Sequence, residues 1–185
     1  MVHVSSGSVD DELREAVDAG VELANVLADG DRDDVRQVLV VHGFTRAPGA
    51  SEAEIDEVAR RFGPTAAIIA TLPEAPFAQA VASVNTELAA HPVAPSLAAH
   101  DGAPLHIHWT ATSATFGVQV AVDVLMALAH TLCDSGTERF GRCAAEGCGR
   151  LFYDATKNRS RRFCRDPRCA SRTHTAHHRA RQRAT

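Results

Sequence analysis

The last 48 residues of the chain hold four of its five cysteines, in two pairs with the same spacing. The pairs are Cys143-x4-Cys148 and, after fifteen intervening residues, Cys164-x4-Cys169. In a reducing compartment, two close pairs at this separation indicate a metal site before they indicate disulfides. Four thiolates suit tetrahedral Zn²⁺ and leave no open coordination position, so the expected zinc is structural.

Few large apolar residues accompany these cysteines. They are Phe140, Leu151, Phe152, Tyr153 and Phe163. Five such side chains are too few to fold a segment of this size by burial alone, so we expect the metal to supply much of its folding free energy. Cys133 lies outside the pattern, and its helical spacing from Val122 and Met126 predicts a buried thiol on a core face.

The charge of the chain is split between its two parts. Residues 1–137 carry 6 basic and 19 acidic side chains, whereas residues 138–185 carry 13 basic and 4 acidic ones. This asymmetry predicts a basic module that binds an anionic polymer. The alternative is a basic tail that folds back on its own acidic domain.

The basic segment ends in a stretch without large apolar residues, from Arg165 to Thr185. Its Ala, Arg and His composition after Pro167 favours a helix. A helix without an apolar face is either frayed or ordered by something other than a protein core, and a phosphate backbone would serve. The alternative is a disordered, solubilising tail. The candidate DNA-contacting residues are Lys157, Arg159, Arg161, Arg162, Arg168, Arg172, Arg179, Arg181 and Arg183.

The first 137 residues are predicted to be mostly helical. Apolar stripes and caps predict helices over 9–27, 33–43, 51–72 and 77–88, the third interrupted or kinked at Gly63-Pro64. Two short strands flanking His100-Asp101-Gly102 predict a β-hairpin. A long helix over 114–134 follows, with Gly136 as its cap. The expected fold class is mainly α with a small β-hairpin, divided into domains 1–137 and 138–185.

Composition excludes some classes of protein. With 45% hydrophobic and 23% charged residues, the chain is not wholly disordered. No uncharged apolar run approaches the roughly 20 residues that a membrane-spanning helix needs. The acidic N-terminus lacks the basic and apolar parts of a signal peptide, so we expect a cytoplasmic protein without membrane contact.

The stretch RFGRCAAEGCGRLFYDATKNRSRRFCRDPRCASRTHTAHHRARQR resembles the zinc finger of the CGNR family. The preceding domain, with its hairpin sequence PLHIHW, resembles the ABATE domain of proteins described as stress-induced transcription regulators. The resemblance implies that the four paired cysteines bind zinc and that Arg172 matches the closing arginine of the motif. The chain departs from the family at Ala170 and Ser171, which replace Gly and Asn.

These observations predict a zinc-dependent DNA-binding transcription regulator. Its basic helix would contact double-stranded DNA, and its N-terminal domain would sense a ligand or form a homodimer. His106 and His108 lie on one face of their strand and could hold a metal or an anionic effector, although a polar strand face is the more common explanation. The main alternative is a zinc adaptor that binds RNA or protein without operator specificity. We expect no enzyme, because His174 and its neighbouring histidines lack a paired carboxylate.

Overall fold

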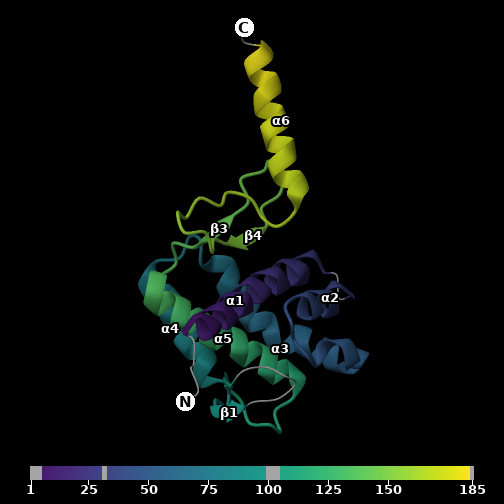
Figure 1. The fold of residues 1–185 in the computed structure, drawn as a ribbon, viewed down its shortest axis with the longest axis vertical. Helices are drawn as coiled ribbons and strands as arrows, with labels where there is room; N and C mark the ends of the chain where they lie inside the picture. The colour runs from purple at the N-terminus through teal and green to yellow at the C-terminus, as the bar shows by residue number, and fades with distance from the viewer. Residues whose placement is uncertain (1–5, 31–32, 99–104, 184–185) are drawn as a thin grey trace.

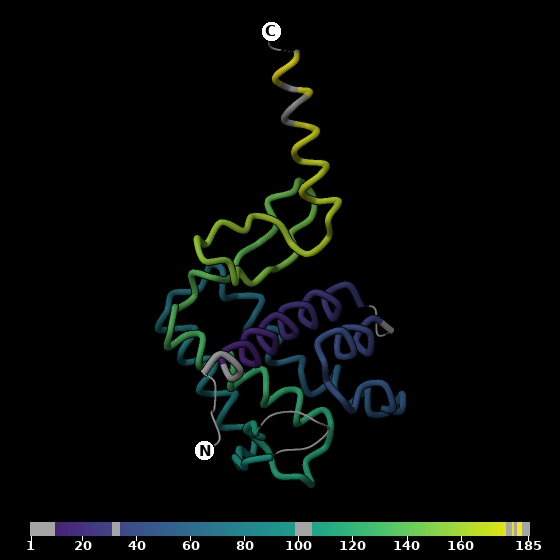
Figure 2. Tube along the Cα trace, in the orientation of Figure 1, coloured from purple at the N-terminus to yellow at the C-terminus, as the bar shows by residue number. Residues whose placement is uncertain are grey.

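The computed structural model describes residues 6–30, 33–98 and 105–183. Within them, helices α1 to α5 form a helical body, and α6 projects away from it (Figures 1 and 2). The body contains α1 (Ser6–Asp29), α2 (Asp33–Val41), the 3₁₀ helix η1 (Ala47–Gly49), α3 (Glu52–Thr71), α4 (Phe77–Ala89), β1 (Ser96–Ala98), β2 (His106–His108) and α5 (Phe116–Ser135). The C-terminal segment adds β3 (Phe140–Arg142), β4 (Leu151–Tyr153) and α6 (Pro167–Arg183). The predicted mainly α fold with a small β-hairpin is confirmed, and a second antiparallel strand pair lies in the C-terminal segment.

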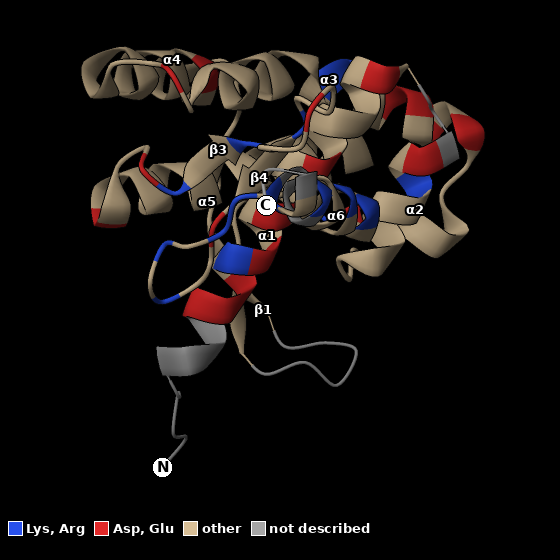
Figure 3. Ribbon diagram, turned by 90° about the horizontal axis from the view of Figure 1, so that it is seen from above, with Lys and Arg blue, Asp and Glu red and all other residues tan. Residues whose placement is uncertain are grey.

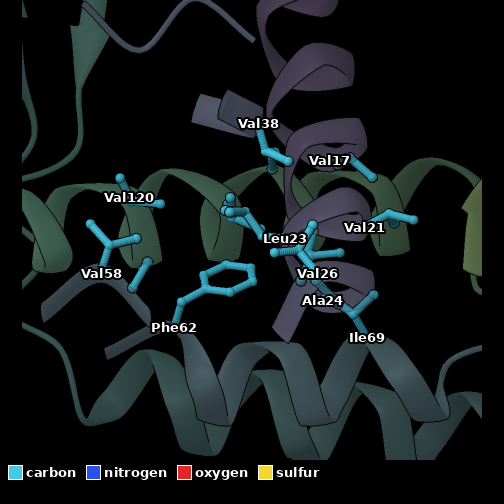
Figure 4. Packing of buried hydrophobic residues seen from close by; sticks show 14 of the residues in the cluster. Val17, Val21, Leu23, Ala24, Val26, Val38, Val58, Phe62, Ile69 and Val120 are labelled. Atoms are coloured by element: carbon cyan, nitrogen blue, oxygen red, sulfur yellow. The ribbon is translucent and has the colours of Figure 1, made fainter. Parts of the chain in front are cut away.

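The core of the body forms around α5. Helices α1 and α3 pack against it, and Figure 4 shows Phe62 of α3 among valines from α1 and α5. Where α1 crosses α5, a Cβ added at Gly20 would lie 2.5 Å from Cγ1 of Val124. A glycine at position 20 therefore allows the two helices to approach this closely. By length and composition α5 could cross a membrane, but 61% of its most apolar stretch is buried inside the fold.

The predicted burial of Cys133 is wrong, because the structure exposes it. The C-terminal half of α5 buries Leu125, Leu128 and Leu132. Cys133 follows the last of these residues by one position, and a step of one residue turns a side chain by about 100° around the helix. The thiol therefore leaves the core at the end of α5.

Helix α3 begins as predicted but is not interrupted. The Ser51 hydroxyl accepts the Glu54 amide at 3.3 Å, and the Glu54 carboxylate accepts the Ser51 amide at 2.9 Å, which completes a capping box. The helix continues through Pro64 to Thr71. Phe62 and Ile69 are buried on either side of Pro64, so tertiary packing offsets the roughly 3 kcal/mol that an internal proline costs.

The predicted hairpin forms from β1 and β2, which pair antiparallel with Leu97 opposite Ile107. Its predicted turn at His100-Asp101-Gly102 lies outside the described residues. Leu97 and Ile107 are both exposed. The hairpin therefore presents apolar side chains on its outer face, at the end of the molecule opposite α6 (Figure 1).

The C-terminal segment begins after Gly136, which caps α5 with a φ of 60°. Its β3–β4 hairpin packs on the body: Phe140, Leu151 and Tyr153 belong to the same buried cluster as α1, α3 and α5. The side chain of Asn25 on α1 pairs with the backbone of Leu151, accepting its N–H at 2.8 Å and donating to its carbonyl at 3.0 Å. Three of the five large apolar residues of the basic segment thus join the core of the body.

Candidate metal centre and basic surface

The four paired cysteines come together at the junction of the β3–β4 hairpin and α6. Their sulfur atoms all lie within 4.8 Å of one another, with Cys148–Cys164 at 3.8 Å and Cys164–Cys169 at 3.7 Å. Zn–S bonds of 2.3 Å in tetrahedral geometry place sulfurs about 3.8 Å apart. The cluster therefore has the ligand type, number and spacing of a structural zinc site.

Local backbone geometry aims the sulfurs at this point. Gly147 and Gly149, which flank Cys148, have φ values of 72° and 66°, a region that favours glycine. The Cys143 amide donates to the Arg150 carbonyl at 2.8 Å, which ties the two ends of the first cysteine loop together. Cys169 is in the first turn of α6, so a bound metal fixes that end of the helix to the hairpin.

The thiols of the cluster differ in acidity. Burial disfavours the thiolate of Cys143, but backbone hydrogen bonds from Cys164 and Ala145 outweigh burial and lower its pKa to about 7. Burial raises the pKa of Cys164 to about 12. Because zinc binds thiolates, its binding must release the proton that Cys164 holds at neutral pH.

Asp154, which the sequence did not single out, organises the turn between the two cysteine pairs. This buried carboxylate accepts the amides of Thr156 and Arg161, both at 2.8 Å, and the Thr156 hydroxyl at 2.6 Å. Burial opposes its ionisation, but the hydrogen bonds from Thr156 and Arg161 lower its pKa below the usual range. The Asp-x-Thr spacing, typical of an Asx turn, was the signal available in the sequence.

Arg161 lies inside this turn. Its guanidinium donates to the carbonyls of Tyr153 and Phe163, both at 3.0 Å, and lies 5.6 Å from the centre of the Phe152 ring. Among the nine predicted DNA-contacting residues, Arg161 is therefore the one that holds the turn together through backbone carbonyls.

The other predicted contacts divide between the turn and α6. Lys157, Arg159 and Arg162 are exposed on the turn, and Arg159 forms an ion pair with Glu138. Asp166 caps α6 by accepting the Arg168 amide at 2.9 Å, and its hydrogen bonds with the Arg168 side chain lower the pKa of Asp166 to about 2. The other predicted DNA-contacting residues that are exposed on α6 are Arg172, Arg179 and Arg181, whereas the side chain of Arg183 is not described.

Three further arginines face the acidic body. Arg142 binds Glu74 at 2.7 Å, Arg150 pairs with Asp29, and Arg165 reaches Asp18 and Glu22, both at 2.8 Å. The basic segment thus folds back on the body through these residues, while α6 does not. Figure 3 looks down on α6, with the acidic residues of α1 to α3 around its base. The acidic residues of the body and the arginines of α6 are therefore also separated in space.

His42 lies beside this contact. Its side chain is fully buried, with Nδ1 2.6 Å from Glu15 and Nε2 2.9 Å from Glu22. Burial disfavours the imidazolium, but the hydrogen bond with Glu22 and the charges of both glutamates outweigh burial and raise the pKa of His42. Since Glu22 also binds Arg165, an uninterrupted polar chain joins the body to the residue that follows Cys164.

His106 and His108, the predicted ligand-binding pair, lie at a separate cavity of about 780 Å³ in the body. Their Nε2 atoms are 3.1 Å apart. In the described part of the chain, the only group of three or more metal-binding side chains is the four-cysteine cluster. Among the described residues, the two histidines thus do not belong to a group of three metal-binding side chains.

Four cysteines at tetrahedral spacing, supplied by a hairpin, a turn and the start of a helix, define a zinc finger. Residues 139–182, about a quarter of the chain, match the model of the CGNR zinc finger family. The match includes all four cysteines and most of α6, and it does not extend to the helical body. A comparison with curated proteins finds no significant match. The finger and its site support zinc-dependent binding of nucleic acid or protein.

Proposed function

We propose that the chain is a zinc-dependent DNA-binding transcription regulator that reads double-stranded DNA with α6. The observation that carries the proposal is the placement of α6, which is anchored at one end by Cys169 and projects away from the body (Figure 1). Its arginines Arg168, Arg172, Arg179 and Arg181 are exposed. A helix without an apolar face gains little from a protein surface. Phosphate groups complement its charge.

The dimensions of α6 suit a DNA groove. Its 17 residues span about 25 Å, enough to cross a major groove about 12 Å wide. Lys157 and Arg162 on the preceding turn would contact flanking phosphates. The acidic body supports the same orientation, because its net negative charge repels DNA and leaves the α6 end to approach it.

Six of the exposed cations give the expected strength of the salt dependence, and Arg159 is left out of this count because it pairs with Glu138. The six are Lys157, Arg162, Arg168, Arg172, Arg179 and Arg181. If all six contact phosphates, a plot of the logarithm of the association constant against the logarithm of the salt concentration has a slope of about −5. Because a single small module offers a limited footprint, operator specificity would need a homodimer. The exposed Leu97–Ile107 pair of the β1–β2 hairpin is a suitable apolar contact for one.

The test is anisotropy of a labelled duplex titrated with the zinc-loaded full chain over a salt series. The variant Arg179→Gln/Arg181→Gln removes two charges of α6, and Arg60→Gln/Arg61→Gln removes two exposed charges of α3 as a matched control. We expect the α6 variant to make the salt slope shallower by about 2, while the control leaves it unchanged. Equal slopes for all three proteins would refute the role of α6.

The alternative, a zinc adaptor for RNA or protein, is decided by competition. Unlabelled duplex DNA, single-stranded RNA and an acidic peptide are each added to the preformed complex. We propose that duplex DNA competes best, since α6 offers arginines and no Phe, Tyr or Trp for stacking on single-stranded bases. As a regulator, the chain would act in the cytoplasm and respond to an effector bound by its N-terminal body, in line with a stress-response role.

A further inference from the structure

The 780 Å³ cavity of the body has the size and walls of an organic ligand site. It lies between α1, the loop after α2, the strand β2 and the N-terminal half of α5. Cavities of about 300–1,000 Å³ with mainly apolar walls hold small organic molecules. Phe44, Trp109 and Phe116 supply aromatic surface to this one.

The charged groups around the cavity favour a cation. Glu12 and Glu15 face it from α1, and Asp123 faces it from α5. Its one arginine, Arg46, is already bound to Gln119 at 2.8 Å and to Glu54 at 3.1 Å, and His42 is bound to Glu15. His106 and His108 also line the cavity, and their Nε2 atoms lie 3.1 Å apart. The basic side chains of the lining thus have partners, whereas an anionic ligand would meet the carboxylates of Glu12 and Asp123.

Asp123 is the central group of this argument. Among the described residues, no hydrogen-bond or ion-pair partner faces its carboxylate. Burial raises the pKa of Asp123 to about 7, since removal from water disfavours its charged form. An unpaired carboxylate in an apolar wall is costly, and a cation bound beside it would remove that cost.

The aromatic walls already accommodate a cation in one place. The guanidinium carbon of Arg46 lies 5.0 Å from the centre of the Phe116 ring. A positive charge at this distance from a ring face is attracted by the ring quadrupole. Trp109, the strongest aromatic partner for cations, lies in the same wall next to His108.

We propose that this cavity binds an organic cation with an aromatic or otherwise apolar body, with Asp123 as its counter-ion. The polar end of the ligand lies against Asp123 and Glu12, and its apolar part lies against Phe44, Trp109 and Phe116. Binding itself is independent of DNA recognition. Only the regulatory consequence, in which the cation is the effector, rests on the proposed function.

The test compares two probes of nearly equal size and shape with opposite charges, tetraphenylphosphonium and tetraphenylborate. Each is titrated into the zinc-loaded full chain without DNA while the emission of Trp109, the only tryptophan, is recorded. This signal arises in the cavity wall, so adsorption of either ion to α6 does not affect it. We expect saturable quenching by the cation at a concentration at least about tenfold lower than by the anion.

Two variants and a control assign the effect to the cavity. Asp123→Asn should weaken binding of tetraphenylphosphonium about tenfold, and Glu12→Gln, a change at an exposed position, should weaken it about threefold. Asp134→Asn removes an exposed carboxylate from the same helix outside the cavity and should change nothing. Equal affinity for both probes, or unchanged cation binding in both cavity variants, overturns the proposal. Because the assay contains no DNA, either outcome is separate from the duplex-binding test.

Discussion

Removal of zinc should unfold α6 and leave the helical body intact. Within the described part of α6, the only buried side chain is that of Cys169, so the helix has no apolar face to hold it. The Asp166 cap remains after chelation, but an isolated helix of this length with clustered arginines is marginal in water. The body keeps its own core, to which the β3–β4 hairpin contributes Phe140, Leu151 and Tyr153.

The expected loss of helical signal follows from the lengths of the helices. With 17 residues, α6 is about a sixth of the residues in α-helices, so chelation should lower the circular dichroism signal at 222 nm by about a sixth. The emission of Trp109 should not change, because this residue lies in the wall of the cavity within the body. Added zinc should restore the lost signal.

Two cysteine variants check the cause. Cys169→Ser should show the reduced signal even with zinc present, whereas Cys133→Ser, at an exposed cysteine outside the cluster, should match the unmodified chain. Loss of most of the helical signal on chelation, together with a red shift of Trp109, would refute the reasoning, since the body would then depend on the metal. A signal at 222 nm that chelation leaves unchanged would also refute the reasoning, since α6 would then be stable without zinc.

Three further changes test the packing and the cavity by urea unfolding. Gly20→Ala should destabilise the chain by about 1–2 kcal/mol, because its contact with Val124 outweighs the gain in helix propensity. Asn25→Leu should cost about 2–4 kcal/mol, because it leaves two backbone groups of Leu151 unpaired. Asp123 has a pKa of about 7 in the folded chain against 3.8 otherwise, so the folded chain holds more protons between these values and loses stability as pH rises. Asp123→Asn lacks this loss and should be the more stable protein at pH 8, with no difference near pH 4; a constant difference would contradict the raised pKa.

The features that the sequence predicts best are those determined by residues only a few positions apart. Two C-x4-C pairs lead to a four-sulfur cluster because the glycines beside Cys148 adopt left-handed conformations that close the first loop. The spacing of Ser51 and Glu54 predicts the start of α3 for the same kind of local reason. In both cases, the groups that determine the structure are within a few residues of one another.

The errors and omissions arise where distant residues decide. Pro64 does not break α3, because the packing of Phe62 and Ile69 is stronger than the local signal. The partners of Arg165 are more than 140 residues away on α1. Periodicity carries no information about such partners. Likewise, the sequence places His106 and His108 on one strand face but does not reveal the cavity beside them or that Asp123 also lines it.

The central claim is that zinc organises the C-terminal segment into a surface that binds DNA. The most direct measurement is the anisotropy of a labelled duplex titrated with the full chain, zinc-loaded and zinc-stripped, over a salt series. We expect the zinc-loaded chain to bind with a slope of about −5 in log affinity against log salt, and the stripped chain to bind at least about tenfold more weakly. Equal affinity with and without zinc, or no binding by the zinc-loaded chain even at low salt, would contradict the account.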